Sequence, residues 1–357
     1  MKFRNFKMVD YVVYGRGCFS QLGDILVPHR RNGAPMVFLV DHFFRNKPLA
    51  NRVPVESNDQ VIFVDVTHEP KTKYVDSIAN ELKENFGTVS GVIGIGGGST
   101  MDLAKAVGLM MTNPGSSSDY QGWDLVKVPG VYKAGIPTLS GTGAEVSRTT
   151  VLTGPTRKLG MNSDFTPFDQ IVLDPELTTN APVNQRFYTG MDCYIHCIES
   201  LTGTYLNEFS KSYGEKALDL CRKVFVEKEE WNNESDDQLM MASYAGGMSI
   251  AYSQVGVAHA VSYGLSYLLG TKHGIGNCIV FDKLEEFYPA GVKEFKYMVE
   301  KNKVDIPQHI TKGLSDNDFE KMITVSLGMK PLWENALGKE WEKIMTHDKL
   351  RALYEKL

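Results

Sequence analysis

The chain has 357 residues, of which 42% are hydrophobic and 23% are charged, a balance typical of a soluble globular protein of about two domains. Its net charge of −5 and its scattered Lys and Arg residues exclude a broad basic surface, so nucleic acid is not an expected partner. The five cysteines form no Cys-x-x-Cys pair and suit the reducing cytoplasm. The longest apolar stretch, about 248–269, contains Gln254, His259 and several glycines, which favours buried helices over a membrane span.

The first half alternates short apolar runs with amphipathic stretches, which is typical of βα units around a largely parallel sheet. We expect buried strands at 35–41, 61–66 and 91–95, and a helix at 75–86 with one apolar face. Asp41 ends the first strand, where a carboxylate can accept hydrogen bonds from adenosine ribose hydroxyls and repel a 2′-phosphate. This favours NAD over NADP; a surface aspartate in a turn is the alternative interpretation.

A glycine run, Gly96–Lys105 (GGGSTMDLAK), follows the third strand and opens a helix. Backbone amides at a helix N-terminus are what a pyrophosphate needs. The run differs from the Gly-x-Gly-x-x-Gly fingerprint, and glycines also serve ordinary tight turns. The candidate phosphate contacts are Gly96, Gly97, Gly98 and Ser99.

A second polar turn, 137–146, carries hydroxyl groups and two glycines. We expect it to lie at another helix start, with Ser140 or Thr142 as the cap. After about 175 the pattern becomes mainly helical, and the expected helices are 183–203, 210–229, 236–252, 254–269, 291–301, 316–326 and 339–356.

The helix at 183–203 carries Asp192 and His196, four residues apart and therefore on one face. His259 and His273 each lie in apolar surroundings, where an unpaired imidazole is expensive to bury. Each histidine taken alone could be a core residue bonded to a backbone carbonyl. As a set, one carboxylate and three imidazoles suit a divalent transition metal with an open coordination position.

The spacing Asp-x3-His, then a His in an Ala-rich helix, then a His-Gly fourteen residues on, resembles the iron-containing (group III) alcohol dehydrogenase family from about Val9 to about Phe281. The glycine run matches the family motif from Gly96 to Lys105, and the second polar turn matches the stretch that lines its cofactor cleft. The resemblance implies an α/β nucleotide-binding domain of the dehydroquinate synthase-like type at 1–176, followed by an all-helical metal-binding domain at 177–357.

The same resemblance implies the cofactors and most site residues. One Fe2+ or Zn2+ would be bound by Asp192, His196, His259 and His273, and NAD would be the hydride carrier. Further cofactor contacts would be Asp102, Thr138, Ser140, Thr142 and Lys158. A lone lysine at 158 would otherwise be interpreted as solvated.

Two positions depart from the family pattern. Many members have a histidine one turn after the third ligand as a possible proton relay, but here the residue is Tyr263, a poorer base at neutral pH. Lys272 precedes His273 where proline is common; a cation there suits an anionic substrate, although a lysine extending to solvent is the alternative. The region after Phe281 also diverges, so the outer wall of the substrate pocket cannot be transferred from the family.

Within the family, the chain as a whole resembles enzymes that oxidise the C8 alcohol of the acidic sugar 3-deoxy-manno-octulosonate (Kdo). That implies an aldehyde product that passes to a pyridoxal-phosphate aminotransferase for the 8-amino sugar of lipopolysaccharide. The family resemblance by itself implies a homodimer, and the cysteines and the lack of a membrane-spanning pattern favour a cytoplasmic protein. Lys272, Arg148 and Arg186 are candidate partners of the sugar carboxylate.

Three alternatives remain open on the sequence. The motifs fit a dehydrogenase of lactaldehyde, glycerol or butanol type equally well. A lyase like dehydroquinate synthase would need a phosphate pocket dense in Lys and Arg, and no such cluster surrounds the expected ligands. The third alternative is a non-catalytic binding or structural protein in which the metal only stabilises the helical domain. Such a protein would not need the matched cofactor motifs.

Overall fold

The computed structural model describes residues 6–357. By its internal packing the chain divides into two compact units. The first, the sheet unit, comprises residues up to Leu139 and Ala144–Ala181, and the second, the helical unit, comprises Ser140–Gly143 and Pro182–Leu357. The predicted order, an α/β part followed by a helical part, is confirmed.

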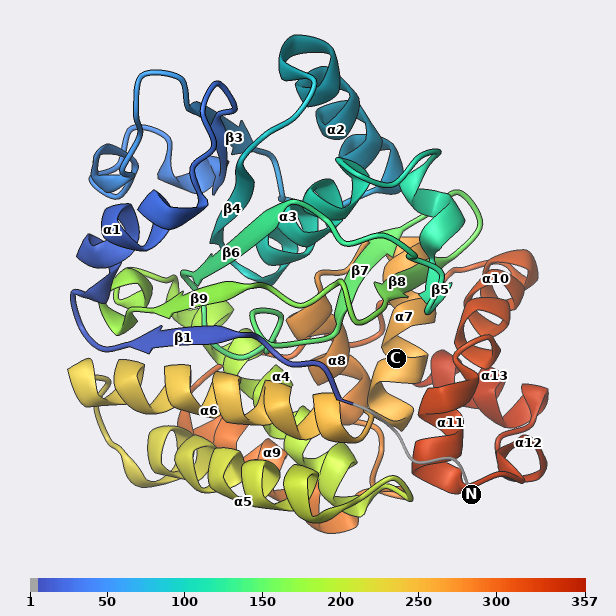
Figure 1. Ribbon diagram of the computed structural model, residues 1–357. Coiled ribbons are helices and arrows are strands. Elements are labelled where there is room, and N and C mark those ends of the chain that lie inside the picture. Colours follow the sequence, from blue (N-terminus) through green and yellow to red (C-terminus); the bar gives the residue numbers. More distant parts are fainter. Residues whose placement is uncertain (1–5) are drawn as a thin grey trace. The chain divides into compact units, whose positions relative to one another are not determined.

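The sheet unit is built on six parallel strands, in the order β1-β9-β6-β4-β2-β3 (Figure 1). The strands β2, β4 and β9 are apolar and buried along almost their whole length, as expected for a parallel sheet covered on both faces. The three predicted strands are confirmed to within two residues at each end. The predicted burial is wrong for β3, which is an edge strand with Val61 37% exposed. The bounds are β1 (Tyr11–Tyr14), β2 (Met36–Asp41), β3 (Gln60–Val64), β4 (Gly91–Gly96), β6 (Tyr132–Pro137) and β9 (Gln170–Leu173).

The helices of the sheet unit connect its parallel strands. α2 (Thr72–Phe86) joins β3 to β4 and α3 (Gly98–Met110) joins β4 to β6, while α1 (Leu22–Leu26) precedes β2. The buried face of α2 includes Val75, Ile78 and Leu82, which is the apolar face expected from the sequence. A second, three-stranded sheet was not predicted from the sequence; it consists of β5 (Gly122–Trp123), β8 (Lys158–Asn162) and β7 (Thr149–Thr153).

The direction in which successive strands are added to the large sheet changes between β2 and β4. From β2 it moves outward to β3, and from β3 it crosses back to β4 on the other side of β2. In an open α/β sheet, ligands bind outside the carboxyl ends of the strands at such a switch point. Asp41 and Gly96 are the last residues of these two strands, so the fold places them at the edge where a nucleotide is expected.

The helical unit contains ten α-helices among the described residues (Figure 1). Its helix starts are well defined, since Asn207, Asn232 and Ser315 each cap a helix with the side chain. The bounds are α4 (Val183–Thr202), α5 (Glu208–Arg222), α6 (Asn233–Tyr252), α7 (Val257–Leu269), α8 (His273–Phe281), α9 (Pro289–Lys301), α10 (Asp316–Leu327), α11 (Lys330–Leu337), α12 (Trp341–Ile344) and α13 (His347–Glu355).

The helix predictions were partly wrong. The sequence did not predict α8 or α11, and α5 ends at Arg222, where a π-helical turn over Lys223–Glu227 replaces its expected last residues. The single helix expected at 339–356 is broken because the Thr346 side chain accepts a hydrogen bond from the Lys349 amide and starts α13. Within residues 6–357, every helix falls short of the length or apolar character needed to cross a lipid bilayer.

The polar turn at 137–146 does not begin a helix, contrary to prediction. Turns and bends lead from Pro137 into β7, and the reason is backbone geometry at two glycines. Gly141 has a φ of 144° and Gly143 a φ of 63°, values that side-chain-bearing residues rarely adopt. A Cβ on Gly141 would lie 1.7 Å from the Thr189 carbonyl oxygen, so the segment packs directly against the backbone of α4.

Candidate functional site

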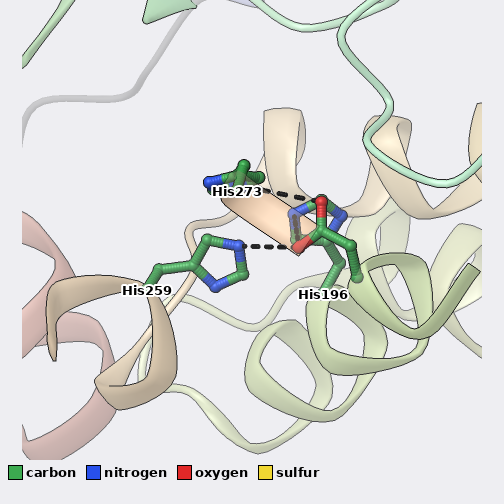
Figure 2. Close-up of side chains that lie close together, drawn as sticks. His196, His259 and His273 are labelled. Atoms are coloured by element: carbon green, nitrogen blue, oxygen red, sulfur yellow. Dashed lines mark ion pairs between the residues drawn. The ribbon is translucent and has the colours of Figure 1, made fainter. Parts of the chain in front are cut away.

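Four potential metal ligands converge in the helical unit. Asp192 and His196 project from one face of α4, His259 lies near the start of α7, and His273 is the first residue of α8. One donor atom from each residue lies within 4.8 Å of the other three. Figure 2 shows the three imidazoles turned toward one another, with His259 and His273 each paired to the carboxylate. Candidate ligands from three different helices thus converge at one place.

The carboxylate of Asp192 is the centre of this cluster. Its Oδ1 lies 3.5 Å from Nε2 of His259 and 3.7 Å from Nε2 of His196, and its Oδ2 lies 3.5 Å from Nε2 of His273. Asp192, His196 and His259 are buried, whereas the His273 side chain is 22% exposed. Three of the four side chains are therefore shielded from solvent, and solvent has access to the cluster next to His273.

Charge in the cluster is distributed unevenly. Burial alone would raise the pKa of Asp192, but the neighbouring imidazoles of His273 and His196 outweigh it and hold that pKa well below its usual range. Burial lowers the pKa of His196 to about 4. Burial would also lower the pKa of His259, but the carboxylates of Glu199 and Asp192 raise it to about 9. The centre therefore presents an anionic oxygen and a neutral His196 imidazole at neutral pH.

The donor set fits a divalent cation. Among residues 6–357, Oδ2 of Asp192 has no hydrogen-bond donor although it is buried, which is costly unless a cation compensates. A side-chain amide, Asn277 Nδ2, lies 2.6 Å from Oδ1 of Asp192, 3.0 Å from Nε2 of His259 and 3.2 Å from Nε2 of His273. An NH2 group has two hydrogens, so it cannot donate to all three of these atoms at once.

Two residues beside the candidate metal ligands, Asn277 and Glu199, were not predicted from the sequence. Asn277 is one turn after His273 on α8, and Glu199 is one turn after His196 on α4. Glu199 is buried and lies 2.5 Å from Nδ1 of His259. Helical spacing from the ligands would have indicated both residues.

The candidate phosphate cradle lies at the carboxyl edge of the large sheet. Gly97 is the N-cap of α3, and no side chain among the described residues caps this helix start, so its first amides remain available to an anion. Gly98 and Ser99 are half-buried. The backbone amide of Thr138 donates to the Gly96 carbonyl over 2.9 Å. The glycine run and Thr138 therefore lie together.

There is no room for larger side chains in this cradle. A Cβ on Gly96 would lie 2.3 Å from Oγ1 of Thr100 and 3.0 Å from the Asp41 Cβ. Asp41 itself is only partly exposed, and its Oδ1 accepts a hydrogen bond from the Phe43 amide over 2.9 Å. Asp41, the candidate ribose contact, and the glycine run therefore lie close together.

Lys158 is not a solvated lysine. It lies fully buried in β8, with its Nζ 2.5 Å from Oε2 of Glu69. Burial raises the pKa of the nearby Asp102 to about 7, although Lys105 and Lys158 oppose the rise. Asp102 and Lys158 are therefore close enough to interact electrostatically, in the sheet unit that carries the cradle.

Lys105, the last residue of the glycine motif, is a structural residue. Its Nζ is buried and donates to the carbonyl oxygens of Ala144, Ser147 and Thr149 over 2.5, 2.9 and 3.1 Å. Burial lowers its pKa to about 8. It anchors the chain that follows the second polar turn rather than facing a ligand.

The remaining candidates are divided between the two units. Ser140 and Thr142 belong to the helical unit, separate by packing from Thr138. The Tyr263 ring lies 6.0 Å from the His273 ring, centroid to centroid, so a phenol is near the open side of the metal cluster.

The three cations suggested for a substrate carboxylate have different surroundings. Arg148 forms ion pairs of 2.5 Å with Asp124 and 2.9 Å with Asp164. Arg186 lies over the Trp231 ring at 4.3 Å. Lys272 is exposed and is the N-cap of α8, directly before His273. Lys272 is therefore the cation best placed beside the metal cluster.

Together, a nucleotide-type parallel sheet and a buried cluster of one aspartate and three histidines define a metal-dependent enzyme of the dehydrogenase class. The family model described as iron-containing alcohol dehydrogenase matches residues 10–175, and that of the family's C-terminal part matches 186–332. The chain therefore belongs to the iron-containing alcohol dehydrogenase family, and it is an oxidoreductase acting on CH–OH groups. The resemblance deduced from the motifs is confirmed.

The individual relatives share less than a third of their aligned residues with this chain. An NAD-dependent methanol dehydrogenase of Bacillus methanolicus is 29% identical over 77% of this chain and 73% of its own length. A sulfoacetaldehyde reductase of Bilophila wadsworthia is 29% identical over 64% of this chain and 60% of its own length. The structure of an alcohol dehydrogenase from Oenococcus oeni superimposes with a TM-score of 0.84 at 21% identity, covering 99% of this chain and 100% of that one. This last likeness establishes the fold.

Proposed function

We propose that the protein oxidises a primary alcohol to an aldehyde, with NAD as hydride acceptor and one divalent ion, Fe2+ or Zn2+, held by Asp192, His196, His259 and His273. The observation that carries the proposal is the convergence of these four donors within 4.8 Å, with only His273 partly exposed. A catalytic metal site keeps a coordination position open for water or substrate, and the partly exposed side next to His273 is where such a position would lie.

The chain's own residues supply the ligand geometry and exclude water. When bound, a divalent ion supplies Lewis acidity that polarises an alcohol or carbonyl oxygen. Asp192, His196 and His259 are buried, and electrostatic interactions are stronger away from bulk water. Imidazole and carboxylate ligands suit both Fe2+ and Zn2+, so the donor set favours neither.

The NAD site would be formed at the carboxyl edge of the sheet. The amides of Gly97, Gly98 and Ser99 at the start of α3 would hold the pyrophosphate, and Asp41 the adenosine ribose. Support comes from the switch point between β2 and β4 and from the uncapped start of α3. The other proposed cofactor contacts are Gly96, Asp102, Thr138, Ser140, Thr142 and Lys158.

Tyr263 is the proposed proton relay. Its ring lies near His273 on the exposed side of the cluster, where an alcohol proton would have to leave. A phenol with an ordinary pKa near 10 is a weak base at neutral pH, so relay through ordered water is the mode we propose.

For the substrate we propose the C8 primary alcohol of Kdo, which the whole-chain resemblance suggests. Lys272 supports an acidic substrate because it is exposed and adjacent to His273, whereas Arg148 is already paired with two aspartates. The aldehyde product would need amination by a pyridoxal-phosphate aminotransferase, which would place the reaction in lipopolysaccharide biosynthesis.

A small alcohol or diol is the second candidate substrate. It is favoured by the relatives, since the Bacillus methanolicus enzyme is named for methanol and a structural neighbour for 1,3-propanediol. The experiment below separates the two.

We further propose a cytoplasmic homodimer. The five cysteines are buried free thiols, which suits a reducing compartment. β1 is an edge strand whose Tyr11, Val12 and Tyr14 are exposed, and an exposed apolar edge is a ready template for pairing with another strand. We expect sedimentation velocity to show a dimer. A monomer at every protein concentration measured would contradict this proposal.

The test of function uses metal-stripped protein reloaded anaerobically with Fe2+ or Zn2+ and supplied with NAD. Kdo, methanol and 1,3-propanediol are compared by NADH absorbance and aldehyde trapping. Metal-dependent NADH formation with Kdo supports both the reaction and the substrate. Turnover of the small alcohols alone removes the Kdo proposal, and absence of turnover with either metal removes the catalytic proposal.

Lys272→Met is a matched variant for the substrate question. If Lys272 binds the sugar carboxylate, the variant raises KM for Kdo about tenfold or more, the loss expected for a charge-assisted hydrogen bond. KM for 1,3-propanediol, which has no carboxylate, should not change. An equal change for both substrates would show that Lys272 only supports the fold.

A further inference from the structure

Glu199 is a buried carboxylate that the proposed reaction does not use. It lies on α4 one turn beyond His196 and is 1% exposed. Its two oxygens have different partners: Oε1 accepts a hydrogen bond from the Ala258 amide over 2.6 Å, and Oε2 lies 2.5 Å from Nδ1 of His259. The hydroxyl of Tyr288 lies 3.5 Å from Oε1. One carboxylate therefore contacts both a helix start and a candidate metal ligand.

The start of α7 depends on this carboxylate. Its N-cap is Gly256, which has no side chain to satisfy the first amides of the helix. Oε1 of Glu199 supplies the missing acceptor at Ala258, the second residue of the helix. A negative charge at a helix N-terminus is favourable, which helps to explain how Glu199 is buried with Ala258, His259 and Tyr288 as its hydrogen-bond partners.

The second oxygen determines which nitrogen of His259 can bind a metal. An ionised carboxylate only accepts hydrogen bonds, so Nδ1 of His259 must carry the hydrogen in their 2.5 Å contact. Nε2 then keeps its lone pair when the ring is neutral, and this is the atom that lies 3.5 Å from Oδ1 of Asp192. The contact also fixes the orientation of the ring.

We propose that Glu199 is a positioning residue that holds His259 in the Nδ1–H tautomer and aims its Nε2 at the metal, while its other oxygen fixes the start of α7. The inference rests on the proposed function, because it assumes that His259 is a metal ligand. It assigns Glu199 no contact with substrate or with NAD.

Glu199→Gln tests the tautomer of His259, because the hydrogen bond from the Ala258 amide determines which way the glutamine amide faces. The amide oxygen of the glutamine must face the Ala258 N–H, since an NH2 group there would meet another donor. The NH2 group therefore faces Nδ1 of His259 and requires a lone pair on it, which moves the ring hydrogen to Nε2. The side chain keeps its size, but His259 is held in the wrong tautomer.

The first measurement is metal affinity of the full-length, metal-stripped protein. Zn2+ and Co2+ are titrated in competition with a chromophoric chelator. We expect Glu199→Gln to weaken binding about 10–100-fold, the loss usual for such carboxylate partners of metal-bound histidine. Glu199→Asp keeps the acceptor but shortens the reach, so its affinity should lie between those of the wild type and the glutamine variant.

The second measurement is nitrogen-15 NMR of the histidine rings in the metal-free chain. In the wild type, Nδ1 of His259 should remain protonated at every pH at which the chain is folded. In Glu199→Gln, Nδ1 should lose its hydrogen when the ring becomes neutral. This readout needs neither metal nor turnover.

The matched control is Glu294→Gln. Glu294 is another hydrogen-bonded carboxylate of the helical unit, which accepts from the Tyr194 hydroxyl over 2.7 Å and pairs with Arg222 but contacts no candidate ligand. Its variant should lower the melting temperature and leave metal affinity unchanged.

The outcomes separate this inference from the proposed function. Metal binding by Glu199→Gln that equals the wild type, with only a lower melting temperature, would overturn the positioning role. A hydrogen on Nε2 rather than Nδ1 of neutral wild-type His259 would overturn it even if the variant does not fold. Failure of the wild type to bind metal, with the expected tautomers, would refute the metal site and leave the role of Glu199 in orienting His259 supported.

Discussion

A substitution of Gly96 by alanine would show whether the glycine run is a cofactor cradle. The added Cβ would lie 2.3 Å from Oγ1 and 2.6 Å from Cβ of Thr100, and 3.0 Å from the Cβ of Asp41. Non-bonded carbon contacts are favourable at about 3.5–4.0 Å, so Thr100 must move by roughly 1 Å. Because Thr100 lies in the first turn of α3, that movement displaces the amides proposed to hold the pyrophosphate.

The magnitude follows from two effects. Overpacking of a close-packed site costs about 1–3 kcal/mol of unfolding free energy. A displacement of about 1 Å at a binding or reacting group can reduce function by roughly 100-fold. We therefore expect Gly96→Ala to unfold at lower urea concentration and to bind NAD much more weakly than the wild type, measured by calorimetry on the same preparation.

The double variant Gly96→Ala/Thr100→Gly provides the decisive comparison. Removing the Thr100 side chain removes the two shortest of the three contacts and leaves only the 3.0 Å contact with the Asp41 Cβ. NAD affinity should therefore recover toward that of Thr100→Gly alone, although glycine within the helix costs about 1 kcal/mol of stability. Gly23→Ala in α1 is the control, since its Cβ would meet only the Pro54 Cβ at 3.4 Å. Unchanged NAD binding in Gly96→Ala, or no recovery in the double variant, would refute the steric argument.

Three further outcomes are expected. Asp41→Ser should raise the preference for NADP over NAD at least tenfold in the ratio of kcat/KM values, because the carboxylate repels a 2′-phosphate; an unchanged ratio would contradict the ribose assignment. Burial alone would raise the pKa of Asp59, but hydrogen bonds from Arg30 and the backbone lower it. The ionised Asp59 therefore stabilises the folded chain above the unfolded-state pKa of about 3.9, and this stabilisation is lost as the pH falls through the lower pKa of the folded state. The difference in melting temperature between wild type and Asp59→Asn should therefore shrink below about pH 4, and a difference independent of pH would be inconsistent with this. Zn2+ at 100 times its Kd should add about 2.7 kcal/mol to the unfolding free energy, whereas His273→Ala should show little of this effect at the same zinc concentration.

The sequence was informative wherever the relevant spacing is local. Asp192 and His196 share a helix face because 3.6 residues make a turn, and the structure places them together as expected. Asp41 and Gly96 end buried apolar runs, so their positions at strand ends followed from hydrophobic patterning. The family motif then supplied His259 and His273, which no local rule would have joined to α4.

Local rules failed where packing between distant segments sets the conformation. The turn at 137–146 was expected to start a helix, but Gly141 and Gly143 adopt positive φ values, and the backbone of α4 occupies the space of a Cβ on Gly141. Lys158 could be interpreted from sequence as solvated, yet it is buried in an ion pair with Glu69. Such partners, about 90 residues apart in the chain, are invisible to periodicity.

The sequence by itself therefore determined the α/β-then-helical order, the candidate phosphate cradle and the types of the proposed metal ligands, because strand patterning, helix spacing and motif chemistry are properties of neighbouring residues. Only the tertiary structure decided how those ligands are oriented. The contact of Glu199 with His259 joins residues 60 positions apart, and the amide of Asn277 reaches Asp192 from 85 positions away. These contacts depend on how α4, α7 and α8 pack, and that packing is set by the whole hydrophobic core rather than by any one segment.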